Sequence, residues 1–194
     1  MKELKVNQIS FKIGDHLHNN MIRTLYSVMI DDEDMNKKMI EQINLQGDQQ
    51  EPKTSVKGQM TTWEMCTYPG FDIFAKYYVN IAHYIVNEKY KFDCKFEHIK
   101  LSCLWGTKYK SGEIATEHDH WPATFGCVYY MNPPKDCTGL YFRELDYTIK
   151  PVHGQLTIFD AYLRHEVPSK PFKGNRYCVS GNITIVGKEE LRVN

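Results

Sequence analysis

Apolar and polar residues alternate from residue 98 onward, and this period of two constrains the fold of the second half of the chain. Ile99, Leu101, Cys103 and Trp105 occupy every second position of one predicted strand. Glycine, proline, asparagine and aspartate separate further predicted strands over 125–131, 139–143, 155–160 and 177–186. Short antiparallel strands at this spacing are typical of a sandwich or small barrel. We therefore predict a β-sandwich of jelly-roll type.

The first half of the chain has a different pattern. Residues 9–13 can form one strand, and acidic residues precede a short amphipathic helix over 35–43. Apolar side chains repeat at helical spacing over 71–90, which predicts a helix that covers one face of the sheet. Residues 47–58 are mostly polar, so we expect an exposed loop there.

Composition agrees with a single globular domain. Hydrophobic residues make up 42% and charged residues 25% of the 194-residue chain, which excludes wholesale disorder. We predict one α+β domain over residues 1–194, with a mixed helical support region over 1–97 and a jelly-roll core over 98–187. Lys plus Arg and Asp plus Glu each number 24, and this neutral balance argues against general nucleic-acid binding.

The cysteines and the apolar segments bear on the cellular compartment. The six cysteines are scattered and form no Cys-x-x-Cys pair, so they fit neither a zinc finger nor the disulfide framework of a short secreted chain. The opening residues lack the apolar run of a signal peptide, and no stretch of about 18 apolar residues could span a membrane. We therefore expect reduced cysteines in a cytoplasmic protein.

Histidine is the residue type that points to chemistry. His118 and His120 are separated by one residue, and side chains i and i+2 of an extended segment point to the same side. The pair could hold one metal ion while Asp119 faces away. His165 follows an apolar strand and is the candidate third ligand. Three ligands on one face leave positions open for oxygen and substrate, as in non-heme Fe(II) oxygenases.

The same His-x-His spacing also occurs by chance. His16 and His18 have no partner segment, and we expect them to form a surface pair. A structural role in the fold remains the alternative for His118 and His120. Aromatic residues near these histidines, such as Trp121, are expected to be core residues rather than substrate contacts.

Several segments from residue 109 onward resemble, in the same order, motifs of the Fe(II)- and 2-oxoglutarate-dependent oxygenases. The resemblance is strongest to the prolyl-hydroxylase-like members and related small phage proteins. The segments are Tyr109-Lys110-Ser111-Gly112, His118-x-His120, Val128-Tyr129-Tyr130-Met131-Asn132, Gly139-Leu140-Tyr141-Phe142, Gly154-Gln155-Leu156-Thr157-Ile158-Phe159 followed by His165-Glu166-Val167, and Asn175-Arg176-Tyr177-Cys178-Val179-Ser180. Each segment is short, and their ordered combination carries the resemblance.

This resemblance implies a double-stranded β-helix, a cupin-like jelly roll whose core over 98–187 is catalytic. It implies Fe(II) as cofactor, with 2-oxoglutarate and O₂ as cosubstrates. It assigns metal binding and catalysis to His118, His120 and His165. The implied activity is hydroxylation of a C–H bond, with a prolyl or other peptide residue, or a small molecule, as the expected substrate.

The second carboxylate of 2-oxoglutarate needs a fixed cation. Arg176 takes the place of the family's arginine, and its planar guanidinium can pair with both carboxylate oxygens. Tyr129 is the family-matched tyrosine for the same site, and Tyr109 is the second choice. Strand alternation allows only one of Tyr129 and Tyr130 to face inward.

One position departs from the family's pattern. The usual second ligand is a carboxylate, whereas position 120 is histidine. Asp119 could supply a carboxylate only if the chain bulges locally, so an Asp119-containing site stays open. A three-histidine site also resembles hydrolytic zinc sites. Two other functions therefore remain: a non-catalytic jelly-roll binding or virion-associated protein, and a cupin-like metal enzyme without 2-oxoglutarate, which would not need Arg176.

Overall fold

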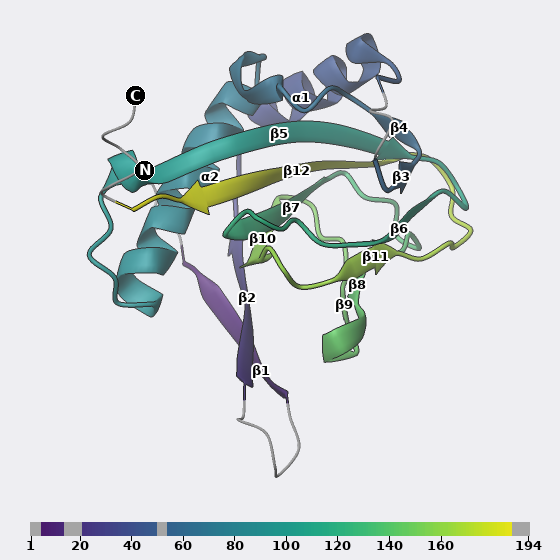
Figure 1. Cartoon of the computed structure of the whole chain (residues 1–194). Helices are drawn as coiled ribbons and strands as arrows, with labels where there is room; N and C mark the ends of the chain where they lie inside the picture. The colour runs from purple at the N-terminus through teal and green to yellow at the C-terminus, as the bar shows by residue number, and fades with distance from the viewer. Residues whose placement is uncertain (1–4, 14–20, 50–53, 188–194) are drawn as a thin grey trace.

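The computed structural model describes residues 5–13, 21–49 and 54–187, and its strands form two facing sheets (Figure 1). Neighbouring strands in both sheets are antiparallel throughout these ranges. The sandwich predicted for the second half of the chain is therefore confirmed. The His16 and His18 pair lies outside the described residues.

One sheet has seven strands and contains the longest ones. In spatial order they are β1 (Asn7–Ile13), β2 (Met21–Met29), β10 (Gln155–Asp160), β7 (Phe125–Met131), β12 (Arg176–Ile185), β5 (Ile99–Tyr109) and β4 (Gln59–Met60). All residues of β7 are buried, because Tyr129 belongs to the core on one side of the sheet while Val128 and Tyr130 belong to the core on the other. Burial of both faces explains why β7 is a continuous apolar run in the sequence.

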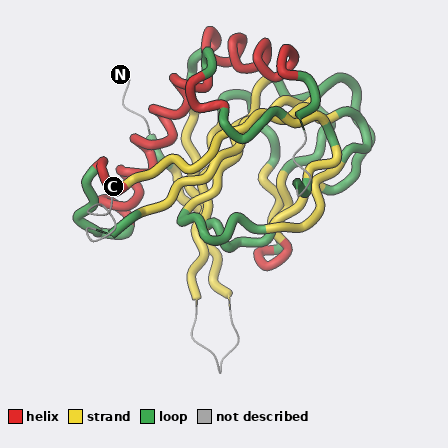
Figure 2. The backbone as a smooth tube through the Cα atoms, turned by 45° about the horizontal axis from the view of Figure 1, so that its top comes forward, coloured by secondary structure: helices red, strands yellow, loops and turns green. Residues whose placement is uncertain are grey.

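Two helices cover the outer face of this sheet (Figures 1 and 2). Helix α1 (Glu33–Gln46) begins at Asp32, whose side chain accepts a hydrogen bond from the Met35 N–H at 3.0 Å. Helix α2 (Phe71–Tyr84) continues into a π-helical turn, η2 (Ile85–Lys89). Both predicted helices are therefore confirmed. The remaining helical turns are η1 (Met65–Thr67), η3 (Phe96–His98) and η4 (Arg143–Leu145).

The second sheet has five short strands. In spatial order they are β3 (Val56–Lys57), β6 (Ile114–His118), β11 (His165–Val167), β8 (Leu140–Phe142) and β9 (Tyr147–Ile149). Its inner face packs against the seven-stranded sheet through a second apolar core that includes Trp105, Phe142 and Phe159. None of the helices in the described part of the chain reaches the length and apolarity that a membrane crossing requires.

The first 97 residues contribute more strands than the sequence predicted. β2 pairs with β10, and the β1–β2 hairpin extends from the body of the molecule (Figure 2). β3 and β4 each add a short strand to the edge of one sheet, where Val56 and Met60 are buried. The prediction of an exposed loop over 47–58 is therefore wrong for its last residues, because a two-residue strand is too short to show a period of two.

Candidate metal and cosubstrate site

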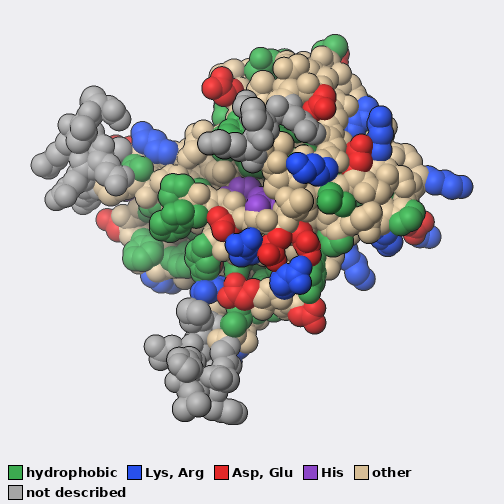
Figure 3. Space-filling model, turned by 45° about the vertical axis from the view of Figure 1, so that its right-hand side comes forward, with side chains coloured by type: hydrophobic (Ala, Val, Ile, Leu, Met, Phe, Trp, Pro, Cys, Tyr) green, Lys and Arg blue, Asp and Glu red, His purple; other side chains and the backbone are tan. Residues whose placement is uncertain are grey.

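A cavity of about 290 Å³ lies between the two sheets. Side chains of β5, β7 and β12 line it on the side of the seven-stranded sheet, and β6 and β11 line it on the other side. Histidine side chains come to the surface in a hollow, bordered by apolar and by charged side chains (Figure 3). The cavity therefore connects a histidine cluster near the surface with the space between the sheets.

His118, His120 and His165 meet in this cavity. His118 ends β6 and His165 begins β11, and the two residues are direct partners across the strands. His120 follows β6, and its backbone N–H donates to the Ala161 carbonyl at 2.7 Å. The Nε2 atoms of His120 and His165 are 3.1 Å apart, and the potential ligand atoms of all three residues lie within 4.8 Å of one another. Three imidazoles at this spacing can bind one metal ion.

Hydrogen bonds and burial set the protonation of these rings. The Nδ1 atoms of His118 and His165 lie 2.7 Å from the carbonyls of Thr116 and Leu163. Because a carbonyl oxygen only accepts, each Nδ1 carries the proton and each Nε2 presents a lone pair. Burial lowers the pKa of all three histidines, to about 3 for His120, and the neighbouring rings lower the pKa of His165 further. The rings are therefore neutral, which is the form that binds metals.

Asp119 lies outside this cluster. Its side chain is exposed, and Oδ1 accepts a hydrogen bond from the Trp121 N–H at 3.1 Å. His118 and His120 therefore approach each other where the chain turns after β6, and not along a continuous strand. In the described part of the chain, the candidate metal-binding group consists of three histidines without a carboxylate.

Arg176 is the first residue of β12, and only 1% of its surface is exposed. Its Nη1 donates to the Thr138 carbonyl, and the guanidinium carbon lies 4.2 Å from the centre of the Tyr109 ring. Its Nε has no hydrogen-bond partner, and no ion pair joins it to a carboxylate within the described ranges. A buried cation without a counter-ion is unfavourable. The cavity wall therefore presents a positive charge suited to an anionic ligand.

Tyr129 and Tyr130 point to opposite sides of β7, as strand alternation predicts. The Tyr129 hydroxyl donates to Asn36 Oδ1 in α1 at 2.8 Å, on the helix side of the sheet. Tyr130 lines the cavity, and its buried hydroxyl has no partner among the described atoms. This placement corrects the choice of Tyr129: Tyr130 and Tyr109 share the cavity with Arg176. Burial raises the pKa of both phenols, so both remain hydrogen-bond donors.

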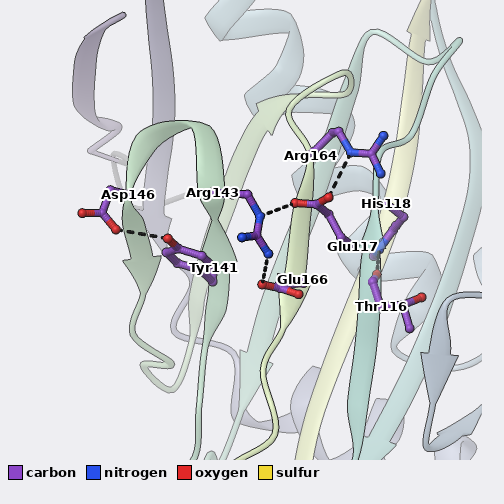
Figure 4. Close-up of polar contacts among 8 residues, drawn as sticks. All are labelled: Thr116, Glu117, His118, Tyr141, Arg143, Asp146, Arg164 and Glu166. Atoms are coloured by element: carbon purple, nitrogen blue, oxygen red, sulfur yellow. Dashed lines mark hydrogen bonds and ion pairs between the residues drawn. The ribbon is translucent and has the colours of Figure 1, made fainter.

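A network of charged residues covers the outer face of β6 and β11 (Figure 4). Arg143 Nε donates to Glu117 at 2.8 Å, and its Nη2 donates to Glu166 at 3.1 Å. Arg164 Nε lies 3.4 Å from the second Glu117 oxygen. The Arg143 hydrogen bond holds the pKa of Glu117 below its usual value. Glu117 and His118 leave β6 in different directions, so this network lies behind the histidine cluster and outside the cavity.

Residues from the first half of the chain also line the cavity, which the sequence interpretation missed. They are residues 54–56, Met60 and Trp63, in and next to β3 and β4. Trp105 and Trp121 line the cavity too, so all three tryptophans of the chain do. Trp121 is 75% exposed, and its prediction as a core residue is therefore wrong. A tryptophan in a turn has no periodic neighbours that would reveal which way it points.

No family model matches this sequence, and no curated protein matches it. Solved structures match the fold. A prolyl-4-hydroxylase from Pseudomonas putida is 13% identical, with a TM-score of 0.64 over 95% of this chain and 95% of that chain. The viral collagen prolyl hydroxylase of Paramecium Bursaria Chlorella virus-1, in its 2OG complex, is 18% identical, with a TM-score of 0.60 over 82% and 96%.

A third similar structure is a prolyl hydroxylase from Trichoplax adhaerens in complex with a peptide fragment of the hypoxia inducible factor oxygen degradation domain. It is 15% identical, with a TM-score of 0.57 over 87% of this chain and 85% of that chain. Each of the three structures matches 82% or more of the present chain. The predicted double-stranded β-helix is therefore confirmed, and the chain has the fold of these prolyl hydroxylases.

Proposed function

We propose that the protein is an Fe(II)- and 2-oxoglutarate-dependent dioxygenase that hydroxylates a C–H bond of its substrate. One observation carries the proposal: three neutral imidazoles and a buried arginine without a counter-ion line the same cavity. Three imidazoles leave several coordination positions of an iron ion open. A guanidinium can bind a carboxylate through two hydrogen bonds. The two features together suit a keto acid that has a chelating end and a distant carboxylate.

The residues fit an iron ion, with one difference from a two-histidine, one-carboxylate site. His118, His120 and His165 would hold it through nitrogen atoms, with Nε2 available on His118 and His165. Without a carboxylate ligand the site carries one negative charge fewer, so we expect weaker iron binding. When bound, the iron supplies the oxidative chemistry by which O₂ and 2-oxoglutarate hydroxylate a C–H bond and yield succinate and carbon dioxide.

The chain's own residues bind and orient the keto acid. Arg176 pairs with its distant carboxylate, and the free hydroxyl of Tyr130 donates a further hydrogen bond. The Tyr109 ring packs against the guanidinium and holds it in place. Apolar side chains such as Leu140 and Val128 line the same space and exclude water from it.

Arg176 also separates this proposal from the two alternatives. A cupin-like metal enzyme without 2-oxoglutarate has no need of a buried cation beside its metal site. A non-catalytic jelly-roll protein needs neither the arginine nor converging histidine nitrogens. Because the unpaired Arg176 lines the same cavity as the histidines, the dioxygenase explains both features.

We further propose a prolyl or other peptide residue as the substrate, and the cytoplasm as the location. Support for a peptide is that the Trichoplax adhaerens structure of the same fold holds one, and that the histidine hollow opens at the surface (Figure 3). Support for the cytoplasm is that all six cysteines are free thiols, which suits a reducing compartment.

An anaerobic titration tests the dioxygenase proposal. Fe(II) followed by 2-oxoglutarate should produce a weak visible charge-transfer band and raise the melting temperature of the protein. His165→Ala should lose the band, whereas Glu166→Ala, which changes the neighbouring residue on the outer face, should keep it. A wild-type protein that shows neither the band nor the thermal shift would overturn the proposal.

A further inference from the structure

The cavity extends along β12 beyond the part that Arg176 occupies. Ser180 and Asn182 line it four and six residues farther along this strand, or about 13–20 Å from Arg176 at the usual rise per residue. Asn182 pairs across the strands with Gly126. Gly126 lies close to the His120 ring, because a Cβ atom added at Gly126 would be 3.1 Å from His120 Cδ2. The keto acid that bridges Arg176 and the histidines therefore leaves this region free. We call it the tryptophan arm, and its residues are Trp63, Cys103, Trp105, Trp121, Ser180 and Asn182.

Aromatic rings dominate the tryptophan arm. Trp105 is buried, Trp63 is 40% exposed and Trp121 is 75% exposed. An indole ring this exposed contributes little to the core, and its face is free for a ligand. Three tryptophans that line one cavity provide electron-rich faces that attract a cation.

One acidic residue lines the cavity beside the tryptophan arm. Asp119 is the only acidic residue among the described residues that line the cavity, and its Oδ1 accepts a hydrogen bond from the backbone N–H of Trp121 at 3.1 Å. Arg176 is the only lysine or arginine among them, and it lies at the far end of the cavity from Ser180 and Asn182. In the proposed function the charges of Fe(II) and the dianionic keto acid cancel, so Asp119 is the lining charge beside the tryptophan arm, and it favours a cation over an anion.

A buried hydrogen-bond acceptor in the same arm lacks a donor. Asn182 lines the cavity, and its side-chain Oδ1 is buried without a hydrogen-bond partner in the described structure. A ligand that donates a hydrogen bond would satisfy this atom.

We propose that the tryptophan arm binds a protonated amine of the substrate. The ammonium group lies against the tryptophan faces, donates a hydrogen bond to Asn182 Oδ1 and is attracted by Asp119. This inference rests on the proposed function and narrows its substrate to an amine-bearing residue or small amine. A prolyl residue within a peptide has no such charge, because its nitrogen is part of an amide.

Intrinsic fluorescence offers a direct test, because all three tryptophans of the protein line this cavity. The protein is held anaerobically with saturating Fe(II) and 2-oxoglutarate and titrated with cyclohexylammonium, cyclohexanol and cyclohexanecarboxylate, which share a ring and differ in charge. Cyclohexylammonium should change the tryptophan emission saturably, with a dissociation constant at least about tenfold lower than that of cyclohexanol. Cyclohexanecarboxylate should have no effect.

Two variants and one control assign the effect to the arm. Trp121→Ala and Asp119→Asn should each weaken cyclohexylammonium binding by about 3- to 30-fold. Both side chains are exposed, so the fold should tolerate the changes. Phe92→Ala removes a ring that is 66% exposed and does not line the cavity, and it should leave binding unchanged.

The outcomes separate this inference from the proposed function. Equal dissociation constants for the ammonium and the alcohol, or tighter binding of the carboxylate, overturn the amine site even where 2-oxoglutarate binds normally. Selective ammonium binding in a protein that never binds 2-oxoglutarate overturns the dioxygenase and leaves the amine site standing. An unchanged affinity in Trp121→Ala would also overturn the arm as the place of binding.

Discussion

The two sheets contribute to the candidate site in different ways. The seven-stranded sheet has long strands, is covered by α1 and α2, and supplies Arg176 from β12. The five-stranded sheet has strands of two to five residues and supplies His118 and His165 from β6 and β11. Its outer face carries partly exposed ion pairs. Arg176, the proposed cation for the cosubstrate, therefore lies on the sheet with the longer strands, and two of the three proposed metal ligands lie on the sheet with the short strands.

This difference has a physical consequence. Elements with few buried contacts open locally at lower free energy than the core of a domain. A bound metal ion would add bonds between β6 and β11, two short strands that have few bonds with each other. The Arg176 guanidinium, in contrast, is held by the Thr138 carbonyl and the Tyr109 ring and needs no ligand for its position.

The largest expected effect is on the core beneath the seven-stranded sheet. Phe74 of α2 is fully buried, and its ring lies 5.0 Å from that of Tyr129. Phe74→Ala should lower the free energy of unfolding by about 3–5 kcal/mol, because it leaves a cavity between the helix and the sheet. Denaturant unfolding measures this loss, with the exposed Phe92→Ala as control. Equal stabilities of the two variants would show that α2 does not support the sheet.

The next effect concerns the cation that this sheet positions. Arg176→Met should lower 2-oxoglutarate affinity by about 30- to 1000-fold, equivalent to about 2–4 kcal/mol. The same change should not lower the melting temperature without 2-oxoglutarate, because it removes a buried charge that has no counter-ion. Arg176→Lys should recover part of the affinity, since an ammonium cannot pair with both oxygens in the same way.

Calorimetric titration of 2-oxoglutarate at saturating Fe(II), without oxygen, measures these affinities. Arg143→Met is the matched control, because Arg143 lies on the outer face of the five-stranded sheet. Unchanged affinity in Arg176→Met would assign the carboxylate to another group or remove the keto-acid site altogether.

The parts of the fold that could be predicted are those with a long periodic pattern. α2 repeats apolar residues over several turns, and β5 alternates over its first half, so both were found from the sequence. β3 and β4 have two residues each and could not be found in this way. Their positions depend on which sheet edges remain unpaired, and that is a property of the assembled fold.

The candidate site, like the fold, could be predicted from the sequence only in part. The spacing of His118 and His120 and the strand before His165 suggested one cluster, and the structure brings the three together, while their metal binding stays a prediction. The choice between Tyr129 and Tyr130 could not be made from the sequence, because both faces of β7 are buried. Which tyrosine faces the cavity depends on the side that α1 covers, where Asn36 binds the Tyr129 hydroxyl.

These two tyrosines give the third prediction. Tyr130→Phe should weaken 2-oxoglutarate binding by about 2- to 12-fold and leave the unfolding free energy nearly unchanged, because the lost hydroxyl has no partner in the protein. Tyr129→Phe should leave 2-oxoglutarate affinity unchanged and lower the unfolding free energy by about 1–3 kcal/mol, because Asn36 loses its buried partner. The reverse pattern would place Tyr129 in the cosubstrate site.

The smallest expected effect is on the ion pairs of the five-stranded sheet. Glu117→Gln removes the carboxylate that joins Arg143 to Arg164 behind His118. Exposed ion pairs contribute little to stability and are screened by salt, so the melting temperature should fall only slightly at low salt. The difference from wild type should disappear at about 1 M salt, where the screening length is about 3 Å. Iron affinity should remain unchanged, because the Nδ1 hydrogen bonds to backbone carbonyls orient His118 and His165 without this network. A large, salt-dependent loss of iron affinity in Glu117→Gln would instead show that charges on the outer face hold the two ligand strands in register.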